Sequence, residues 1–562
     1  MLPEAVQKYR PFPPVFLPDR QWPDRTITQA PRWCSVDLRD GNQALEVPMS
    51  LAQKLEMFRL LVAIGFKEIE VGFPAASQVE YDFIRQLIDE DLIPADVTIQ
   101  VLTQAREALI RRTCAAVRGA RRAIVHLYNS TSTLQRRVVF GLERPAIIAL
   151  AVQGAALIKE LAATMPESEL HFEYTPESFT GTELDFALEI CSAVLAVWQP
   201  TAVRPVIINL PATVEMATPN VYADQIEWFC RHLPERERVI ISVHAHNDRG
   251  TAVAATELAL LAGAERVEGT LFGNGERTGN VDLLTLALNL FTQGIDSKLD
   301  FQRLDRVIEV CERCTALPVH PRHPYAGSLV YTAFSGSHQD AINKGMQARH
   351  QEGATLWEVP YLPLDPTDVG RSYEAIIRIN SQSGKGGAAY VLEAGYGIKL
   401  PKEMQPEFGR IIQAITEQSG RDVEPAAIRQ AFGDEYLQRR KPYHLIAVQI
   451  LERRDDKESL PSLVTVAAEI AKDGDTITIT GQGNGPLDAF CNGFRAAADL
   501  DFTVVSYSEH ALSQGSTAEA VAYIQIADSQ GRSFFGAATD TDISIASLKA
   551  MVCAVNRWHR VG

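Results

Sequence analysis

Between residues 30 and 305, short runs of β-branched residues alternate with segments whose apolar residues recur every three or four positions. Runs of the first kind are typical of buried strands, and segments of the second kind of amphipathic helices. Residues 50–64 illustrate the second kind, with Ser50 as the predicted N-cap. Their apolar positions, Leu55 and Phe58 among them, fall on one helical face. Strands are expected at residues 34–38, 68–72, 97–102, 123–127, 170–174, 205–210, 239–243 and 266–271.

Eight strand-then-helix units in succession predict a (β/α)8 barrel, a fold that typically takes about 250 residues. A doubly wound open sheet is the rival architecture, but the chain has no dinucleotide-binding glycine fingerprint. In a barrel of this kind the catalytic groups lie at the carboxyl ends of the strands. The polar residues that follow each predicted strand are therefore the first candidates for chemistry.

His244 and His246 stand at the carboxyl end of the seventh predicted strand. Side chains two positions apart on a strand point to the same face, and neutral imidazoles bind divalent metals well. Taken alone, this spacing fits two structural histidines beside a turn equally well. Closure of the barrel favours the metal site, because Asp40 follows the first strand and Asn280 follows the eighth. The four side chains then converge from adjacent strands, which predicts a site for Mg²⁺, with Mn²⁺ and Zn²⁺ as alternatives.

A metal held by one carboxylate and two imidazoles keeps open positions that can chelate a 2-keto acid and polarise its carbonyl. Arg39, next to Asp40, could neutralise a developing enolate or alkoxide, or could simply form a structural ion pair. Thr213, after the sixth strand, could donate a hydrogen bond to a substrate carboxylate. A helix N-cap is the other interpretation of Thr213.

The composition fits an ordinary globular protein, with 562 residues, 46% hydrophobic and 22% charged. A formal net charge of -16 argues against nucleic acid or an anionic membrane as the main partner. The eight cysteines are too scattered for a disulfide framework, and the Cys311/Cys314 pair is interpreted as one face of a helix. No signal pattern opens the chain, and its longest apolar run, residues 146–158, is too short to span a bilayer. A cytoplasmic protein is expected.

The chain is expected to divide into an N-terminal arm (1–30), the barrel (31–305), linking subdomains (306–438) and a C-terminal domain (439–562). The last segment is rich in strand-like runs and predicts an α+β fold. It contains a weak internal repeat, because residues 481–489 are echoed by residues 536–543. Each copy follows a strand-like run and precedes a helix-like one, which indicates two similar modules.

Five motifs resemble those of the 2-isopropylmalate synthases, within a wider group of pyruvate-carboxyltransferase-like barrels that includes homocitrate and citramalate synthases. They are DLRDGNQ at 37–43, NLPATVE at 209–215, HAHND at 244–248, GNGERTGN at 273–280 and SGSHQD at 335–340. The resemblance covers essentially the whole chain, including the C-terminal region. It implies a homodimeric enzyme that condenses acetyl-CoA with 2-oxoisovalerate and hydrolyses the thioester, in the first committed step of leucine synthesis.

The resemblance also assigns roles to individual residues. It implies that Asp40, His244 and His246 hold the metal, that Asn280 lines or completes the site, and that Arg39 lies at the reacting carbonyl. Two further residues, Glu177 and His338, resemble the pair associated with proton transfer around the acetyl methyl group. Leucine is the implied effector, bound by the C-terminal domain, with Asp488 and Asp542 as candidate contacts. Both aspartates could equally be helix caps.

Three alternatives remain beside this assignment. A homocitrate-type enzyme must bind a second substrate carboxylate, which Glu173 on the fifth strand is expected to repel. A carbon–carbon lyase on the same barrel would not need the long C-terminal region. A non-catalytic binding protein would need neither Arg39 nor Glu177, both of which are present.

Overall fold

The computed structural model describes residues 3–333, 335–372, 385–419, 423–453, 463–513, 515 and 517–560. The chain separates into two compact units. The first comprises Met1–Val330 and Leu364–Ser372, and the second Tyr331–Pro363 and Tyr373–Gly562.

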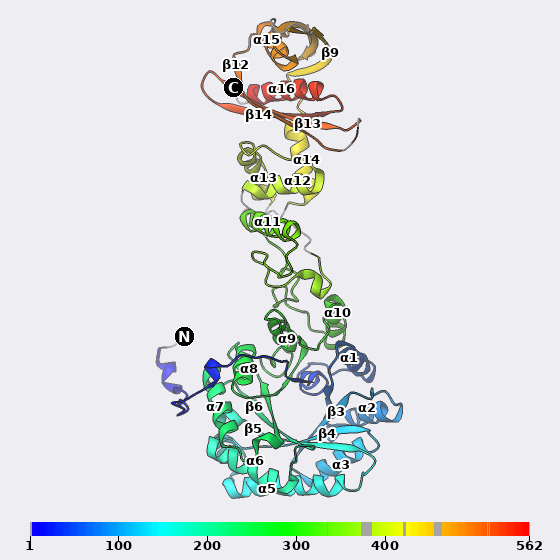
Figure 1. Ribbon diagram of the computed structural model, residues 1–562, viewed down its shortest axis with the longest axis vertical. Coiled ribbons are helices and arrows are strands. Elements are labelled where there is room, and N and C mark those ends of the chain that lie inside the picture. Colours follow the sequence, from blue (N-terminus) through cyan, green and yellow to red (C-terminus); the bar gives the residue numbers. More distant parts are fainter. Residues whose placement is uncertain are drawn as a thin grey trace. The chain divides into compact units, whose positions relative to one another are not determined.

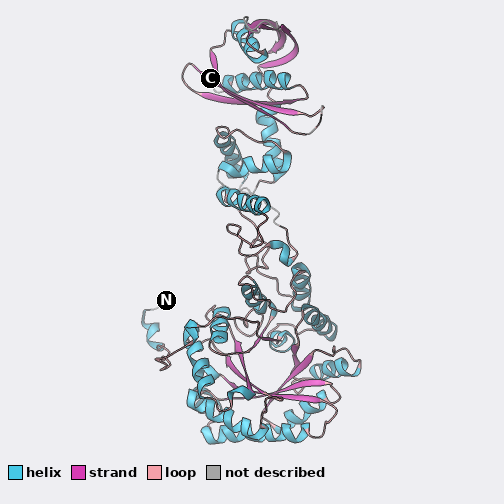
Figure 2. Ribbon diagram, in the orientation of Figure 1, coloured by secondary structure: helices cyan, strands magenta, loops and turns pink. Residues whose placement is uncertain are grey.

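The first unit is a closed parallel barrel whose strands lie in the order β1 to β8, with helices around the outside (Figure 1 and Figure 2). The strands are β1 Arg32–Ser35, β2 Glu68–Gly72, β3 Thr98–Gln104, β4 Arg122–Ser130, β5 Glu169–Glu177, β6 Val206–Ala212, β7 Val239–Ala245 and β8 Arg266–Gly269. Pairing of β1 with β8 closes the ring. The predicted (β/α)8 barrel is confirmed.

The helices between and after the strands cover the outside of the barrel. They are α1 Leu51–Ile64, α2 Gln78–Asp89, α3 Glu107–Val117, α4 Thr133–Gln135, α5 Arg144–Ala162, α6 Leu184–Trp198, α7 Pro219–His232, α8 Ala252–Leu261, α9 Leu283–Phe291 and α10 Leu304–Thr315. Helix α1 begins with a capping box, in which Ser50 accepts a hydrogen bond from the backbone N–H of Gln53 and the Gln53 side chain accepts from the backbone N–H of Ser50. Cys311 and Cys314 are buried, unpaired residues of α10, as the helical interpretation predicted.

The first strand is shorter than predicted, and this change positions the site. Strand β1 ends at Ser35, and Asp37–Gly41 forms one helical turn instead of continuing the strand to residue 38. The Asp37 carboxylate accepts hydrogen bonds from the Ser35 hydroxyl and the Leu271 backbone N–H. The Asp37 backbone N–H also donates to the Ser35 hydroxyl at 3.2 Å, a local bond that competes with a strand ladder, while the bond to Leu271 ties the turn to the segment after β8. Burial raises the pKa of Asp37 to about 7 despite these bonds. The turn carries Asp40 into the barrel mouth.

Among the described residues, α5 is the one helix long and apolar enough to cross a membrane by length and composition. Its buried residues include Ile147, Ala151 and Ile158, and it packs against α3, α6 and β4. A barrel helix with an apolar inner face passes the same test, so length and composition carry no membrane assignment here.

The second unit contains six α-helices and two antiparallel sheets in its described part. The four helices that precede the sheets are α11 Gly336–Glu352, α12 Lys385–Tyr396, α13 Gln405–Ser419 and α14 Pro425–Phe432. One sheet has the order β11-β10-β9 and is followed by α15, and the other has the order β12-β13-β14 and is followed by α16. These elements are β9 Tyr443–Arg453, β10 Leu463–Lys472, β11 Asp475–Gly483, α15 Pro486–Ala498, β12 Phe502–Ala511, β13 Ala520–Asp528, β14 Ser533–Asp540 and α16 Ile543–His559.

The C-terminal region consists of two modules, β9–β11 with α15 and β12–β14 with α16. Each module has a glycine where its helix packs against its last strand. A Cβ on Gly481 would lie 2.1 Å from the Ala489 carbonyl oxygen, and a Cβ on Gly536 2.2 Å from the Ala550 carbonyl oxygen. Both positions therefore need glycine for close helix–sheet packing. The modules share this feature and their order of elements, whereas the repeat in sequence stays a prediction.

The core of the second unit runs across residue 439, where the linking segment was expected to end. Phe408, Phe432 and Tyr436 of the helical segment form one buried cluster with Tyr523 and Phe535 of the sheet. The Arg557 guanidinium on α16 bonds the carboxylates of Glu407 and Glu435. The helices and the second sheet are thus packed as one body.

Candidate active site

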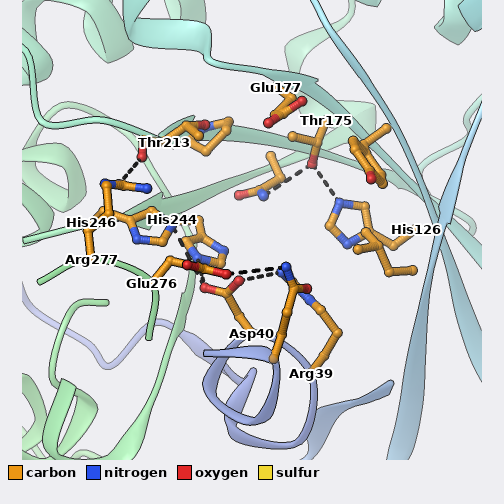
Figure 3. Close-up of a pocket in the computed structure, with 15 residues that line it drawn as sticks. Arg39, Asp40, His126, Thr175, Glu177, Thr213, His244, His246, Glu276 and Arg277 are labelled. Atoms are coloured by element: carbon orange, nitrogen blue, oxygen red, sulfur yellow. Dashed lines mark hydrogen bonds and ion pairs between the residues drawn. The ribbon is translucent and has the colours of Figure 1, made fainter. Parts of the chain in front are cut away.

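A cleft of about 230 Å³ opens at the carboxyl ends of the barrel strands (Figure 3). It brings together six of the residues singled out from the sequence: Arg39, Asp40, Glu177, Thr213, His244 and His246. The other lining residues are Gln43, Leu102, His126, Tyr128, Thr175, Asn209, Pro211, Glu276 and Arg277. His338, Asp488 and Asp542 belong to the second unit.

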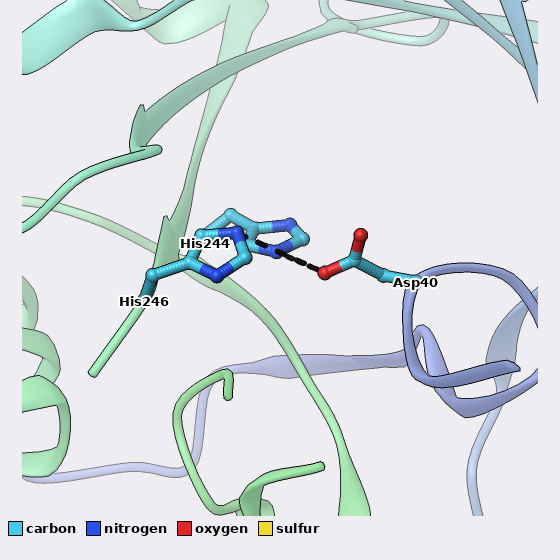
Figure 4. Close-up of side chains that lie close together, drawn as sticks. All are labelled: Asp40, His244 and His246. Carbon is cyan, nitrogen blue, oxygen red and sulfur yellow. Dashed lines mark ion pairs between the residues drawn. The ribbon is translucent and has the colours of Figure 1, made fainter. Parts of the chain in front are cut away.

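Asp40, His244 and His246 form a compact group of buried ligand atoms (Figure 4). Nε2 of His244 lies 3.5 Å, and Nε2 of His246 3.8 Å, from Oδ2 of Asp40. That carboxylate oxygen is buried and has no hydrogen-bond partner in the described chain, and the same holds for Nδ1 of His246. A buried charged oxygen without a partner is costly unless something binds it. The donor set and its unmet oxygen fit a divalent metal ion.

The charges of this group favour a cation. Burial alone would raise the pKa of Asp40, but the charges on Arg39 and His244 hold it well below its usual range. Burial works against charge on His244, yet the ion-pair contact with Asp40 and the hydrogen bond to Glu268 raise its pKa to about 10. Burial and the charge on His244 lower the pKa of His246 to about 4. Metal binding therefore has to displace a proton from His244.

Asn280 lies beside the histidines. Its amide oxygen is 2.7 Å from Nε2 of His244, the nitrogen that also faces Asp40, and its amide nitrogen donates to the carbonyl oxygen of Asn274. The amide oxygen of Asn280 thus points at the group of metal-ligand candidates.

The Arg39 guanidinium is held between two carboxylates and still lines the cleft. Nη1 donates to Oδ1 of Asp40 at 2.7 Å, and Nε donates to Glu70 on β2. The structural ion pairs expected of Arg39 are present and fix the guanidinium at the cleft wall, whereas its role at a reacting carbonyl stays a prediction.

Glu177 and Thr213 line the opposite part of the cleft. Glu177, at the end of β5, accepts a hydrogen bond from the Ser130 hydroxyl. Oγ1 of Thr213 accepts a hydrogen bond from the Ser178 backbone N–H at 2.9 Å. The N-cap interpretation of Thr213 is wrong, because α7 begins at Pro219 with Thr218 as its N-cap residue. The Thr213 hydroxyl hydrogen therefore stays available for a substrate oxygen.

His338 is an exposed residue of α11, and its ring stacks on that of Tyr361 with 4.0 Å between centroids. Because it belongs to the second unit, its pairing with Glu177 stays a prediction.

Several cleft residues were not singled out from the sequence. His126 on β4 has Nδ1 2.7 Å from Glu70 and Nε2 2.6 Å from the Thr175 hydroxyl. Asn209 donates to Thr175 and to Glu268. The sequence does contain a signal that could have identified them. These polar residues interrupt otherwise apolar strands at the alternate positions that face the barrel interior.

The expectation that Glu173 repels a second substrate carboxylate is wrong. Glu173 is fully buried beneath the cleft, 3.4 Å from Arg266, and does not line it. Burial and the neighbouring charge of Glu268 raise its pKa well above its ordinary value. Strand β5 presents Thr175 and Glu177 to the cleft instead.

The second unit has a cavity of about 560 Å³ lined by both C-terminal modules. Its lining residues are Asn484, Gly485, Pro486, Leu487, Asp488, Cys491, Arg495, Thr503, Val504, Tyr507, Glu509, Ile543, Ser544 and Ser547. Asp488 faces this cavity and accepts from the Asn484 backbone N–H at 3.0 Å. Asp542 caps α16, accepting from the backbone N–H groups of Ser544 and Ile545.

Three family descriptions match successive parts of the chain. Residues 30–311 match HMGL-like, residues 328–393 match "Alpha-isopropylmalate synthase, post-catalytic domain-like", and residues 422–559 match "LeuA allosteric (dimerisation) domain".

Full-length relatives named 2-isopropylmalate synthase are similar to the chain throughout. The one from Rhodospirillum rubrum is 58% identical and covers 99% of both chains. The one from Ralstonia nicotianae is 55% identical over 99% of this chain and 96% of its own. The one from Clostridium acetobutylicum is 54% identical over 98% of this chain and 99% of its own.

The geometry of the cleft predicts that chelator-treated protein binds one Mn²⁺ per chain and that His246→Ala weakens this binding. Residues that only hydrogen-bond a metal ligand change the affinity by up to about 100-fold when they are lost. Because His246 would contact the ion directly, its loss is expected to weaken Mn²⁺ binding by more than this. Isothermal titration calorimetry measures the effect, and His232→Ala, at an exposed histidine of α7, is the matched control. Unchanged Mn²⁺ affinity in His246→Ala would contradict the site.

Proposed function

The chain belongs to the 2-isopropylmalate synthase family, and from that premise we propose that its barrel cleft joins acetyl-CoA to 2-oxoisovalerate at a divalent metal ion. The activity is that of an acetyl-CoA-dependent acyltransferase in leucine biosynthesis. The observation that carries the site is the convergence of Asp40, His244 and His246 around an unpaired, buried carboxylate oxygen. We also propose that the protein is located in the cytoplasm.

Asp40, His244 and His246 would hold the metal, with Asn280 beside them. When bound, the ion supplies Lewis acidity toward the ketone of the 2-keto acid. The Asp-His-His set accepts Mg²⁺, our first choice, as well as Mn²⁺ or Zn²⁺. Arg39 adds positive charge at the oxygen that becomes negative when the new carbon–carbon bond forms. The Thr213 hydroxyl donates to the substrate carboxylate.

Glu177 is the proposed base that takes a proton from the methyl group of acetyl-CoA. The Ser130 hydroxyl donates a hydrogen bond to Oε2 of Glu177. Oε1 is therefore the oxygen that we propose faces the substrate. The new nucleophilic carbon then attacks the keto carbon, and water releases CoA as the free thiol. His338 is the proposed partner of Glu177 in moving this proton.

The cleft wall favours a branched apolar side chain over a second carboxylate. Leu102 and Pro211 supply apolar surface. The two arginines of the lining both bond carboxylates of the chain, Arg39 with Asp40 and Glu70, and Arg277 with Asp248. No lining arginine in the described chain is therefore left to pair with a distal substrate carboxylate.

We propose leucine as the feedback inhibitor, bound in the cavity of about 560 Å³ between the C-terminal modules, and a homodimer as the working form. Leu487 and Val504 offer apolar contacts, and Asp488 and Glu509 can meet an ammonium group. The backbone N–H groups at the start of α15 suit a carboxylate. Because this cavity lies in the second unit, inhibition has to act through a coupling between units.

A panel of 2-keto acids tests the substrate assignment. With thiol release from acetyl-CoA as the readout, 2-oxoisovalerate is expected to give a kcat/KM at least about tenfold above that of 2-oxoglutarate, because an unpaired carboxylate in an apolar pocket costs more than 1.4 kcal/mol. Pyruvate makes fewer apolar contacts, so its kcat/KM is expected to lie below that of 2-oxoisovalerate. A preference for 2-oxoglutarate would support the homocitrate-type alternative instead.

Glu177→Gln and His338→Gln test the proton-transfer pair. If the two residues act as one unit, each single variant lowers kcat by about 100-fold or more, and the double variant loses little beyond the worse single one. Steady-state kcat measures this, with His350→Gln on the same helix as the control. Losses that multiply fully in the double variant would mean that the two residues act separately.

Leu487→Ala tests the leucine cavity without removing part of the core that α14 and β14 share. The leucine concentration for half inhibition is expected to rise about tenfold, since several buried CH₂ groups at ~0.8 kcal/mol each lose their contact. Turnover without leucine stays unchanged. Leu463→Ala, at an exposed position of β10, is the control. Equal inhibition of Leu487→Ala and the unmodified protein would place the effector elsewhere.

A further inference from the structure

Glu268, on β8, lies beneath the metal ligands and has no part in the chemistry described above. Its side chain is fully buried and does not line the cleft. Oε2 of Glu268 lies 2.8 Å from Nδ1 of His244. On the other edge of the same ring, Nε2 lies 2.7 Å from Oδ1 of Asn280 and 3.5 Å from Oδ2 of Asp40. One imidazole is therefore held between two carboxylates.

This arrangement determines which ring nitrogen can bind a metal. An ionised carboxylate accepts hydrogen bonds and cannot donate one, so the proton has to stay on Nδ1 of His244. With that proton on Nδ1, the lone pair of the neutral ring is on Nε2, on the side of the ring where Asp40 and Asn280 lie. We propose that Glu268 is the positioning residue of the metal site, holding the tautomer and the ring plane of His244. The inference rests on the metal site of the proposed function.

Glu268 can perform this role because residues of its own strand and of β3 and β6 fix its position. Oε1 accepts from Nη1 of Arg266 at 2.8 Å and from the Gln100 amide at 2.9 Å. Oε2 accepts from the Asn209 amide at 3.1 Å, in addition to the bond with His244. A carboxylate with four donors has little freedom to rotate, and partners of this kind set ligand orientation in metal sites.

The two histidines differ in this respect. Nδ1 of His246 is buried and has no hydrogen-bond partner in the described chain. His244 is thus the histidine that the barrel orients in advance, and Glu268 is the group that does so. Removal of Glu268 should therefore lower the affinity for the metal more than it lowers the rate of any step of the reaction.

The test is a calorimetric titration of the full-length, metal-free protein with Mn²⁺. Glu268→Gln replaces a pure acceptor by an amide that can also donate, and the Kd for Mn²⁺ is expected to rise by about 10- to 100-fold. Glu173→Gln is the matched control, because Glu173 is an equally buried carboxylate of the same barrel interior, 3.4 Å from Arg266, and has no bond to His244. It should bind Mn²⁺ like the unmodified protein.

Glu268→Asp keeps the negative charge beside Arg266 and shortens the side chain by one CH₂. It preserves the ion pair that the fold needs but withdraws the oxygen from His244, so its Kd should rise as well. In both Glu268 variants the Mn²⁺ concentration for half-maximal turnover should rise far more than kcat at saturating Mn²⁺ falls. A general defect of folding would lower kcat without this split.

A measurement on the unmodified protein covers the case in which neither variant folds. In the Mg²⁺-loaded protein with ¹⁵N-labelled histidine, His244 should carry its proton on Nδ1, with the signal assigned by its loss in His244→Asn. The opposite tautomer would overturn the inference. So would wild-type Mn²⁺ affinity in both Glu268 variants, or an equal loss in Glu173→Gln. Absence of Mn²⁺ binding by the unmodified protein would instead overturn the proposed metal site.

Discussion

The ion network around Arg266 inside the barrel is the constraint on which the cleft depends. This guanidinium is fully buried, and it donates to Glu68, Glu268, Ser242 and Gln100. Removing a charge from water costs several kcal/mol, which only well-placed partners can offset. Those partners come from β2, β3, β7 and β8 itself, so the network stabilises one register of the barrel. A shift of one residue in any strand would turn its polar partner to the outside.

Two branches lead from this network to the cleft. One runs through Glu268 to His244, and the other through Gln100 and Glu70 to Arg39. At the cleft the branches meet, because Arg39 and His244 both contact Asp40. Groups held this firmly need little rearrangement when charge develops in a reaction, which is the basis of electrostatic preorganisation. The same buried carboxylates that hold the histidines also explain the raised pKa of His244.

The second unit follows a different principle, in which apolar packing joins segments of distant sequence. Helices α12 to α14 share a core with β13 and β14, and Arg557 reinforces it through Glu407 and Glu435. A ligand that alters the packing of α16 therefore acts on the body that contains the linking helices. A shared core of this kind is a contiguous packed route between α16 and the linking helices, which is what a coupling between them would need.

The alternation of strands and helices determined the barrel, because eight buried parallel strands have few other ways to close. The HAHND motif and its neighbours at strand ends determined the candidate metal ligands, since topology alone makes their strands adjacent. The tertiary structure decided what depends on side-chain burial. Glu173 was expected to face the substrate, but it is fully buried under the cleft with a raised pKa, because the inward register of β5 places it there. Asp37 ends β1 early through bonds to Leu271, a residue far away in the chain. The role of Glu268 likewise needs four partners from separate strands, and no local pattern of residues records such a meeting.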